Sequence, residues 1–205
     1  MSTNEFDRTS VHEAAHTVVW LREEEHLGPP TLITALSDHD TQGRVQGEAG
    51  MLSQPTPRKV RAIARVLAAG AIAEKLAGMG SPRMDSDDAQ KIARLATHVA
   101  QGEKPSVASR QVLEKRFREQ AEAGAELMLR TDWGAVLRLA ATLREFGTLA
   151  GDSGVTLARM QLDGPQEPLV PDVETYFQSC RSLDGVPELA EPILAGVRGE
   201  LKRVA

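Results

Sequence analysis

Cysteine and aromatic residues are scarce in this sequence. A single cysteine, Cys180, occurs among 205 residues, which excludes an internal disulfide and a cysteine-rich zinc cluster. Aromatic residues make up 3% of the chain and hydrophobic residues 41%, so the core must be built mainly from aliphatic side chains. Close-packed helices suit such side chains. We therefore expect a mostly α protein.

Long hydrophobic runs and dense clusters of basic residues are absent as well. The longest apolar stretch, residues 66–73, is much shorter than the roughly 20 residues that a membrane-spanning helix needs. Residues 1–8 are polar and acidic, unlike a signal peptide. The net charge of −5 disfavours a nucleic-acid partner. These features predict a cytoplasmic protein with no membrane span and no nucleic-acid partner.

Hydrophobic periodicity predicts a series of helices with a small sheet near the beginning. The first helix is expected over residues 7–26, ended by Gly28-Pro29-Pro30. A segment rich in β-branched residues, 31–36, and a short run, 44–46, indicate a small sheet or hairpin after this helix. Further helices are expected over 57–78 with Thr56 as N-cap, 87–101 with Ser86 as N-cap, 106–130, from Thr131 as N-cap to Gly147, and up to Met160.

The helical signals weaken after Gly151. We therefore assign residues 1–160 to one mostly α (α+β) domain, and residues 161–205 to a helical appendage of unknown role. Trp20 and Trp133 lie on apolar stripes and are expected in the core.

The run His12-Glu13-Ala14-Ala15-His16 carries the strongest chemical signal. Residues four apart lie on the same face of a helix, so the two histidines can present their imidazoles to one metal ion. Glu13 then lies beside the metal, where it suits the role of a general base that activates a zinc-bound water. This spacing predicts a zinc site.

Two histidines leave such a site one protein ligand short, because catalytic zinc sites usually have three. No glycine and third histidine follow His16 at the metzincin spacing, so that class is excluded. Glu74 on a later helix, or Asp87 or Asp88 at a helix start, could each supply a carboxylate. Glu74 also suits a second role, orienting a ligand histidine from behind. The residue types alone do not choose among these acids. The remaining histidines, His26, His39 and His98, are expected to be solvated or hydrogen-bonded side chains.

Three stretches resemble the peptidase domain of the FtsH family of ATP-dependent zinc peptidases. Residues 12–19 (HEAAHTVV) are similar to the family's HEAGHAVV, 67–76 (LAAGAIAEKL) to its LLGGRAAEEL, and 86–96 (SDDAQKIARLA) to its SNDIERATQLA. The resemblance covers about residues 9–102, with a looser likeness as far as Gly151. It implies a helical zincin-like domain whose zinc is held by His12, His16 and Asp88, with Asp87 as the fallback ligand.

The function that follows is a zinc metalloendopeptidase acting on peptides or unfolded proteins, with Glu13 as the catalytic base. The sequence has no Gly-rich Lys-Ser/Thr loop for ATP phosphates, so unfolding of substrates would need a separate ATPase partner. An oligomer is compatible with the resemblance. The alternative is a non-proteolytic binding or regulatory module that keeps the fold, and in that case we expect residues 161–205 to cover the cleft.

Overall fold

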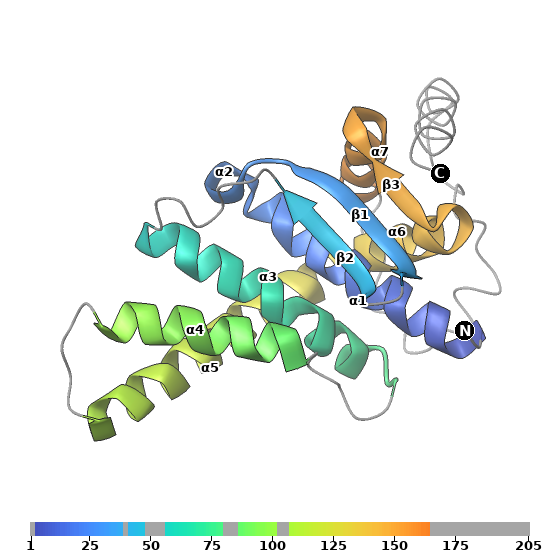
Figure 1. Cartoon of the computed structure of the whole chain (residues 1–205). Coiled ribbons are helices and arrows are strands. Elements are labelled where there is room, and N and C mark those ends of the chain that lie inside the picture. Colours follow the sequence, from blue (N-terminus) through green and yellow to red (C-terminus); the bar gives the residue numbers. More distant parts are fainter. Residues whose placement is uncertain (1–2, 39–40, 48–55, 80–85, 102–106, 165–205) are drawn as a thin grey trace.

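The computed structural model describes residues 3–38, 41–47, 56–79, 86–101 and 107–164 (Figure 1). Most of these residues are helical, and a small sheet accompanies them, which confirms the fold class expected from the sequence. In chain order the elements are α1 (Thr3–Arg22), α2 (Glu24–Leu27), β1 (Pro30–Asp38), β2 (Thr41–Gly47), α3 (Pro57–Leu76), α4 (Ser86–Gln101), α5 (Val107–Thr131), α6 (Trp133–Phe146), β3 (Thr148–Ala150) and α7 (Gly151–Leu162).

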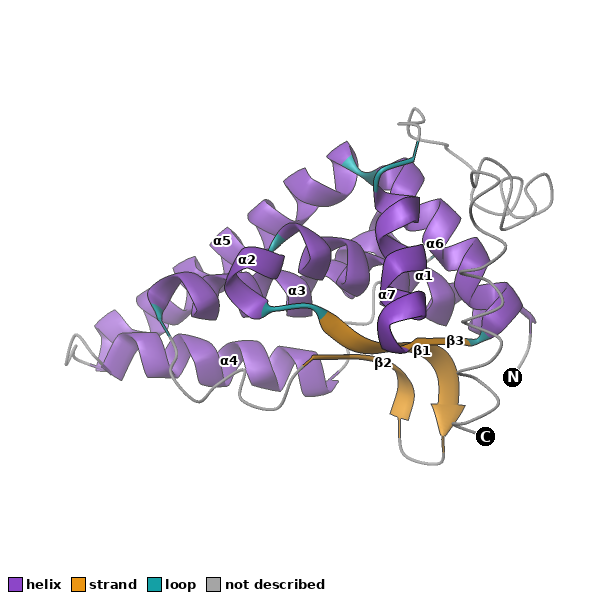
Figure 2. Cartoon of the chain, turned by 90° about the horizontal axis from the view of Figure 1, so that it is seen from above, coloured by secondary structure: helices purple, strands orange, loops and turns teal. Residues whose placement is uncertain are grey.

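The three strands form an antiparallel sheet in the order β2-β1-β3. β1 and β2 make the expected hairpin, with Ile33 opposite Val45. β3 comes from much later in the chain and pairs with the other edge of β1, where Leu149 lies opposite Ile33. The sheet packs against α1, and α7 lies beside β1 (Figure 2). The sequence did not indicate β3, because three residues are too few to show an alternating pattern.

Helices α1, α3 and α6 form the centre of the core. Small side chains let α1 and α3 approach each other closely: Ala15 of α1 and Ala69 of α3 are fully buried. All residues from 133 to 143 in α6 are buried too. Trp20 and Trp133 are 3% and 1% exposed, which confirms that both belong to the core. The close packing of α1 on α3 sets the surroundings of the HExxH motif.

Two helix boundaries follow the signals in the sequence. Thr56 caps α3, because its side chain accepts a hydrogen bond from the backbone N–H of Lys59 at 3.2 Å, and Pro57 is the first helical residue. Gly147 ends α6 with a φ of 73°, a conformation that glycine adopts without steric cost. That turn directs the chain into β3.

The first predicted helix, residues 7–26, is wrong at both ends, because α1 already begins at Thr3. Helix α1 ends at Arg22, and the residues after Glu23 form the separate short helix α2. Glu23 is buried, and its carboxylate accepts a hydrogen bond from Arg65 of α3 at 2.6 Å. No local signal predicts this break, since glutamate is a good helix former.

The predicted N-cap of α6, Thr131, is also wrong. Thr131 is the last residue of α5, and its hydroxyl donates to the carbonyl of Leu127. Asp132 occupies the N-cap position without capping the helix. Its carboxylate instead accepts two hydrogen bonds from Arg22, at 2.9 and 2.7 Å, which join the end of α1 to the start of α6.

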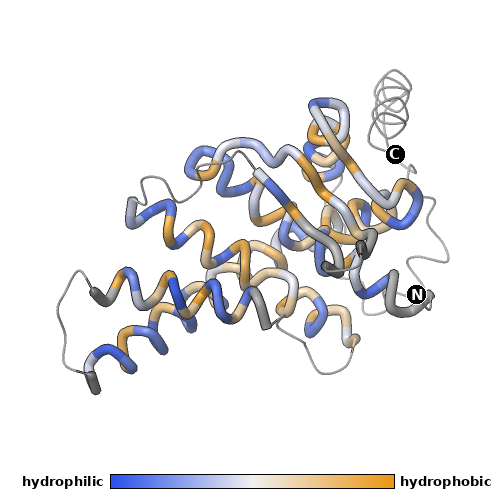
Figure 3. The backbone as a smooth tube through the Cα atoms, viewed as in Figure 1, coloured by the Kyte–Doolittle hydropathy of each residue, from blue (hydrophilic) through white to orange (hydrophobic). Residues whose placement is uncertain are grey.

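Helices α4, α5 and α7 complete the core, to which they contribute buried side chains such as Ile92, Leu129 and Leu157. Helices α4 and α5 pack against α3 and each other, and hydrophilic and hydrophobic residues alternate along them (Figure 3). Helix α7 continues to Leu162, so the domain boundary expected at residue 160 falls inside a helix, and residues 165–205 of the expected appendage lie outside the described residues. In the described part of the chain, none of the helices combines the length and the hydrophobicity needed to span a bilayer.

Candidate metal centre

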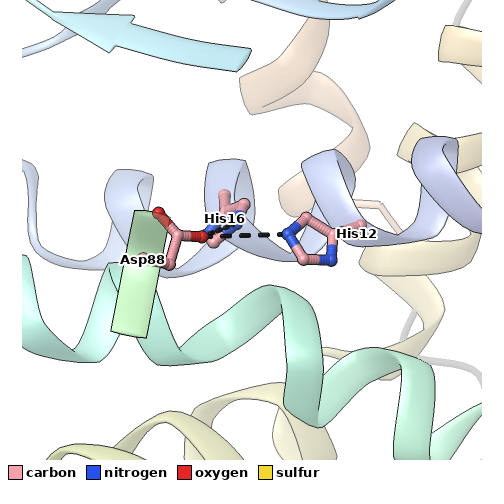
Figure 4. Close-up of side chains that lie close together, drawn as sticks. All are labelled: His12, His16 and Asp88. Carbon is pink, nitrogen blue, oxygen red and sulfur yellow. Dashed lines mark ion pairs between the residues drawn. The ribbon is translucent and has the colours of Figure 1, made fainter. Parts of the chain in front are cut away.

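His12 and His16 lie one turn apart on α1, on the face that α3 and α4 approach (Figure 4). Their ring centroids are 4.6 Å apart, with an angle of 72° between the rings. Asp88, near the start of α4, points its carboxylate at both rings. Its Oδ2 atom lies 3.4 Å from Nε2 of His16 and 3.9 Å from Nε2 of His12. The two histidines of the HExxH motif on α1 thus lie close to a carboxylate of α4.

His16 is fixed by a backbone group of α3. Its Nδ1 lies 2.6 Å from the carbonyl oxygen of Val66. A carbonyl oxygen can only accept a hydrogen bond, so Nδ1 carries the proton and donates it. In the neutral ring the lone pair is then on Nε2, the atom that faces Asp88. His16 is therefore held in the tautomer that a metal ligand requires.

His12 is fixed by a carboxylate of α3. Its Nδ1 lies 2.8 Å from Oε1 of Glu74, which is 4% exposed. The other carboxylate oxygen of Glu74 accepts a hydrogen bond from Arg8, one turn before His12 on α1. An ionised carboxylate accepts hydrogen bonds, so Nδ1 of His12 donates and its Nε2 faces Asp88. A buried carboxylate behind a histidine is a common support for a metal ligand.

Gly70 of α3 makes room for the ring of His12. A β-carbon added at Gly70 would lie 2.3 Å from Nε2 of His12, and 2.4 and 2.5 Å from the two ring carbons next to it. Such distances are far below van der Waals contact. Any side chain at this position would therefore displace the ring.

The donor atoms of His12, His16 and Asp88 all lie within 4.8 Å of one another. Ligands at about 2.1 Å from a tetrahedral zinc ion lie roughly 3.4 Å apart, and the two nitrogen-to-oxygen distances of 3.4 and 3.9 Å are close to this spacing. Lys91, one turn further along α4, lies 3.7 Å from the other carboxylate oxygen of Asp88. The three donors can converge on one metal ion after small side-chain movements.

The charges of these groups depend on one another. Burial lowers the pKa of His12, but the carboxylates of Asp88, Glu74 and Glu13 outweigh this effect and raise the pKa to about 10. Burial raises the pKa of Asp88, but the two imidazoles outweigh it and hold the pKa of this carboxyl well below its usual range. The pKa of Glu74 is also lowered, because His12 and Arg8 outweigh its burial. Both carboxylates are therefore ionised at neutral pH.

Glu13 follows His12 on α1 and is not one of the three clustered donors. It is 4% exposed, and its charge is one of the causes of the raised pKa of His12. Its backbone carbonyl accepts a hydrogen bond from the hydroxyl of Thr17. A carboxylate beside a metal-binding pair, rather than within it, is the arrangement that a general base requires.

The structure brings His12, His16 and Asp88 together, as the resemblance implied. It places Glu74, the alternative ligand, behind His12 on the Nδ1 side. The side chain of Asp87, the fallback ligand, lies outside the described residues. Among the histidines not expected to bind the metal, His26 pairs with Glu25 and His98 is exposed. His39 and the single cysteine, Cys180, lie outside the described residues.

Three groups that support the site, Arg8, Gly70 and the carbonyl of Val66, were not predicted from the sequence. Arg8 lies four residues before His12, so the helical spacing alone could have placed it on the same face. The roles of Gly70 and of the Val66 carbonyl depend on how α3 lies against α1. No residue pattern along the chain gives that information.

No protein-family model matches the chain, and no curated protein sequence matches it. The resemblance to the FtsH family therefore depends on the three stretches quoted above, and family membership stays a prediction. The function is inferred from the geometry of the site.

Proposed function

We propose that this chain is a zinc-dependent metallopeptidase that hydrolyses peptide bonds in peptides or unfolded proteins. The observation that carries the proposal is the convergence of three donor atoms, from His12, His16 and Asp88, within 4.8 Å of one another. A general-base candidate, Glu13, lies beside them on the same helix turn. Two imidazoles and one carboxylate are a ligand set typical of catalytic zinc, and they leave one coordination position for water or substrate.

The fit to a metal ion also depends on the groups behind the ligands. The Nδ1 atom of His16 donates a hydrogen bond to the Val66 carbonyl, and Nδ1 of His12 donates to Glu74. Both Nε2 atoms therefore face the same oxygen, Oδ2 of Asp88. If the two histidines were ordinary surface residues, no such pairing of buried acceptors would be needed. An aspartate in the first turn of a helix often only complements the helix dipole, but this role would not account for the contacts of Asp88 with His12 and His16.

In this role a bound zinc ion would polarise the scissile carbonyl and lower the pKa of a water molecule. Glu13 accepts a proton from the attacking water on its carboxylate. It then gives this proton to the amide nitrogen as the bond between the carbonyl carbon and that nitrogen breaks. His12, His16 and Asp88 would hold the ion, and Glu74 keeps the His12 ring in place. A cytoplasmic location, an oligomer and a separate ATPase partner stay predictions.

The test combines metal content with cleavage. Zinc per chain is measured by plasma mass spectrometry for the wild type, His16→Ala and Asp88→Ala, and casein cleavage is measured for the wild type and Glu13→Gln. Two matched controls are His98→Ala, an exposed histidine of α4, and Asp152→Ala, an exposed aspartate in the first turn of α7. We expect about one zinc per chain, lost in both ligand variants and kept in both controls.

Glu13→Gln should keep its zinc and lose at least about a hundredfold in cleavage rate. Absence of zinc from the wild type would refute the site. Zinc that is bound without any cleavage of casein would support the alternative, a binding or regulatory module with a metal-containing fold.

A further inference from the structure

Arg8 lies one helical turn before His12 and binds the same carboxylate. Its guanidinium donates to Oε2 of Glu74, while Nδ1 of His12 donates to Oε1 at 2.8 Å. The side chain of Glu74 is 5% exposed and that of Arg8 is 27% exposed. One buried carboxylate on α3 is therefore held by two donors from the same face of α1.

These two contacts restrain different motions of the carboxylate. The terminal torsion of a glutamate side chain has a broad energy minimum, so the hydrogen bond to His12 alone leaves the carboxylate plane free to rotate. A charge-assisted bond from an arginine is roughly twice as strong as a neutral hydrogen bond. Arg8 thus fixes the second oxygen, and with it the direction in which Oε1 faces His12.

We propose that Arg8 is a positioning residue of the metal centre, which holds Glu74 so that His12 presents its Nε2 atom to the metal. In this role Arg8 acts on His12 through Glu74 and is not itself a ligand. The inference rests on the proposed function to the extent that a metal must bind at His12, His16 and Asp88. It does not depend on proteolysis.

A simple charge effect of Arg8 would have the opposite sign. A cationic side chain near the site repels a divalent ion, so its removal would tighten zinc binding by a few-fold at most in a solvated, salt-screened position. Loss of positioning would weaken zinc binding instead. Loss of an outer partner of a metal ligand typically weakens binding by 10- to 100-fold, and we expect about tenfold for Arg8 because it acts one residue further out.

The experiment is a double-mutant cycle on zinc affinity, measured by competition with a chromophoric chelator. The variants are Arg8→Ala, Glu74→Ala, both together, and Arg8→Lys. The matched control is Arg144→Ala, because Arg144 also binds a carboxylate of α1, Asp7, at 2.7 Å and is similarly exposed. Thermal unfolding without added zinc checks that each variant folds, and the visible absorption bands of bound Co²⁺ report the ligand field.

Arg8→Ala should bind zinc about tenfold more weakly and shift the Co²⁺ bands, and it should have no further effect in the Glu74→Ala background. Arg8→Lys should restore the affinity to within about threefold of the wild type, since a lysine can still donate to Oε2. Arg144→Ala should leave zinc binding unchanged.

Unchanged or tighter zinc binding by Arg8→Ala overturns the inference, as does an equal loss of affinity in the Glu74→Ala background. If Arg8→Ala does not fold, Arg8→Lys and Arg8→Gln decide: wild-type affinity in both would mean that the ion pair is not needed for positioning. A wild-type chain that binds no zinc overturns the proposed function itself, and is thereby distinguished from a failure of Arg8 alone.

Discussion

At the scale of single residues, the site depends on an absent side chain as much as on those present. Gly70 lies under the ring of His12, and a β-carbon there would come within 2.3 Å of the nitrogen that faces Asp88. Glu74 holds the opposite nitrogen of the ring at 2.8 Å. The ring is thus confined between the backbone of α3 at Gly70 and the carboxylate of Glu74. It can make room for a methyl group at Gly70 only by breaking its hydrogen bond to Glu74.

Gly70→Ala should therefore weaken zinc binding by at least about tenfold, because His12 must leave its position to avoid the added methyl group. A suitable control is Gly124→Ala, because the added carbon would also meet a side chain at 2.8 Å, that of Arg65, but at a place that holds none of the three donors. Titration with a zinc-competing dye gives both affinities. Equal zinc affinity for Gly70→Ala and the wild type would show that the ring can move without loss of the site.

At the scale of elements, ion pairs with a buried carboxylate join helices that are distant in sequence. Arg22 at the end of α1 binds the carboxylate of Asp132 before α6 with two hydrogen bonds, and the side chain of Asp132 is 4% exposed. Arg65 of α3 donates a hydrogen bond at 2.6 Å to the carboxylate of the buried Glu23, which lies between α1 and α2. These pairs fix the end of the helix that carries the HExxH motif.

Arg22→Ala should lower the free energy of unfolding by about 2 kcal/mol, because it leaves the buried carboxylate of Asp132 without its partner. The figure lies below the usual cost of breaking a fully buried pair, since the arginine side chain is 40% exposed. Arg130→Ala breaks an exposed pair with Glu126 within α5 and should cost less than about 0.5 kcal/mol. Urea denaturation of both variants measures the difference, and equal midpoints would contradict a structural role for the pair.

At the scale of the whole molecule, the candidate centre joins three helices. Its ligands come from α1 and α4, and the groups that orient the histidines come from α3. A metal ion bound to the folded chain alone stabilises it by mass action, by about 2.7 kcal/mol at a free concentration one hundred times the dissociation constant. Zinc is therefore expected to stabilise the fold as a whole.

Added zinc should raise the midpoint of thermal unfolding of the wild type, and a chelator such as EDTA should reverse the effect. Asp88→Ala at the same zinc concentrations should show little or no shift, because it lacks one of the three donors. Differential scanning calorimetry records both series. A zinc-dependent shift of equal size in the two proteins would place the ion somewhere other than this site.

Much of the fold follows from local signals. The helical periods, the Thr56 cap, and the glycine that ends α6 act over a few residues, so the sequence was sufficient to predict α3, α4, α5 and α6 as helices. The break at Glu23 and the strand β3 were not predictable in this way. The first depends on an ion pair with Arg65, and the second on pairing with a strand from the other end of the domain.

The site, like the fold, has features set by local sequence and features set by contacts between helices. The spacing of His12, Glu13 and His16 is a property of one helix, so the sequence by itself determined which side chains share a face. Which carboxylate meets them was decided by tertiary structure: Asp88 comes to the Nε2 atoms and Glu74 to the Nδ1 side of His12. The physical reason is that these contacts depend on how closely α3 packs against α1, and on α4 packing in turn against α3. That approach is set by small residues such as Ala69 and Gly70, whose effect appears only when the helices are in contact.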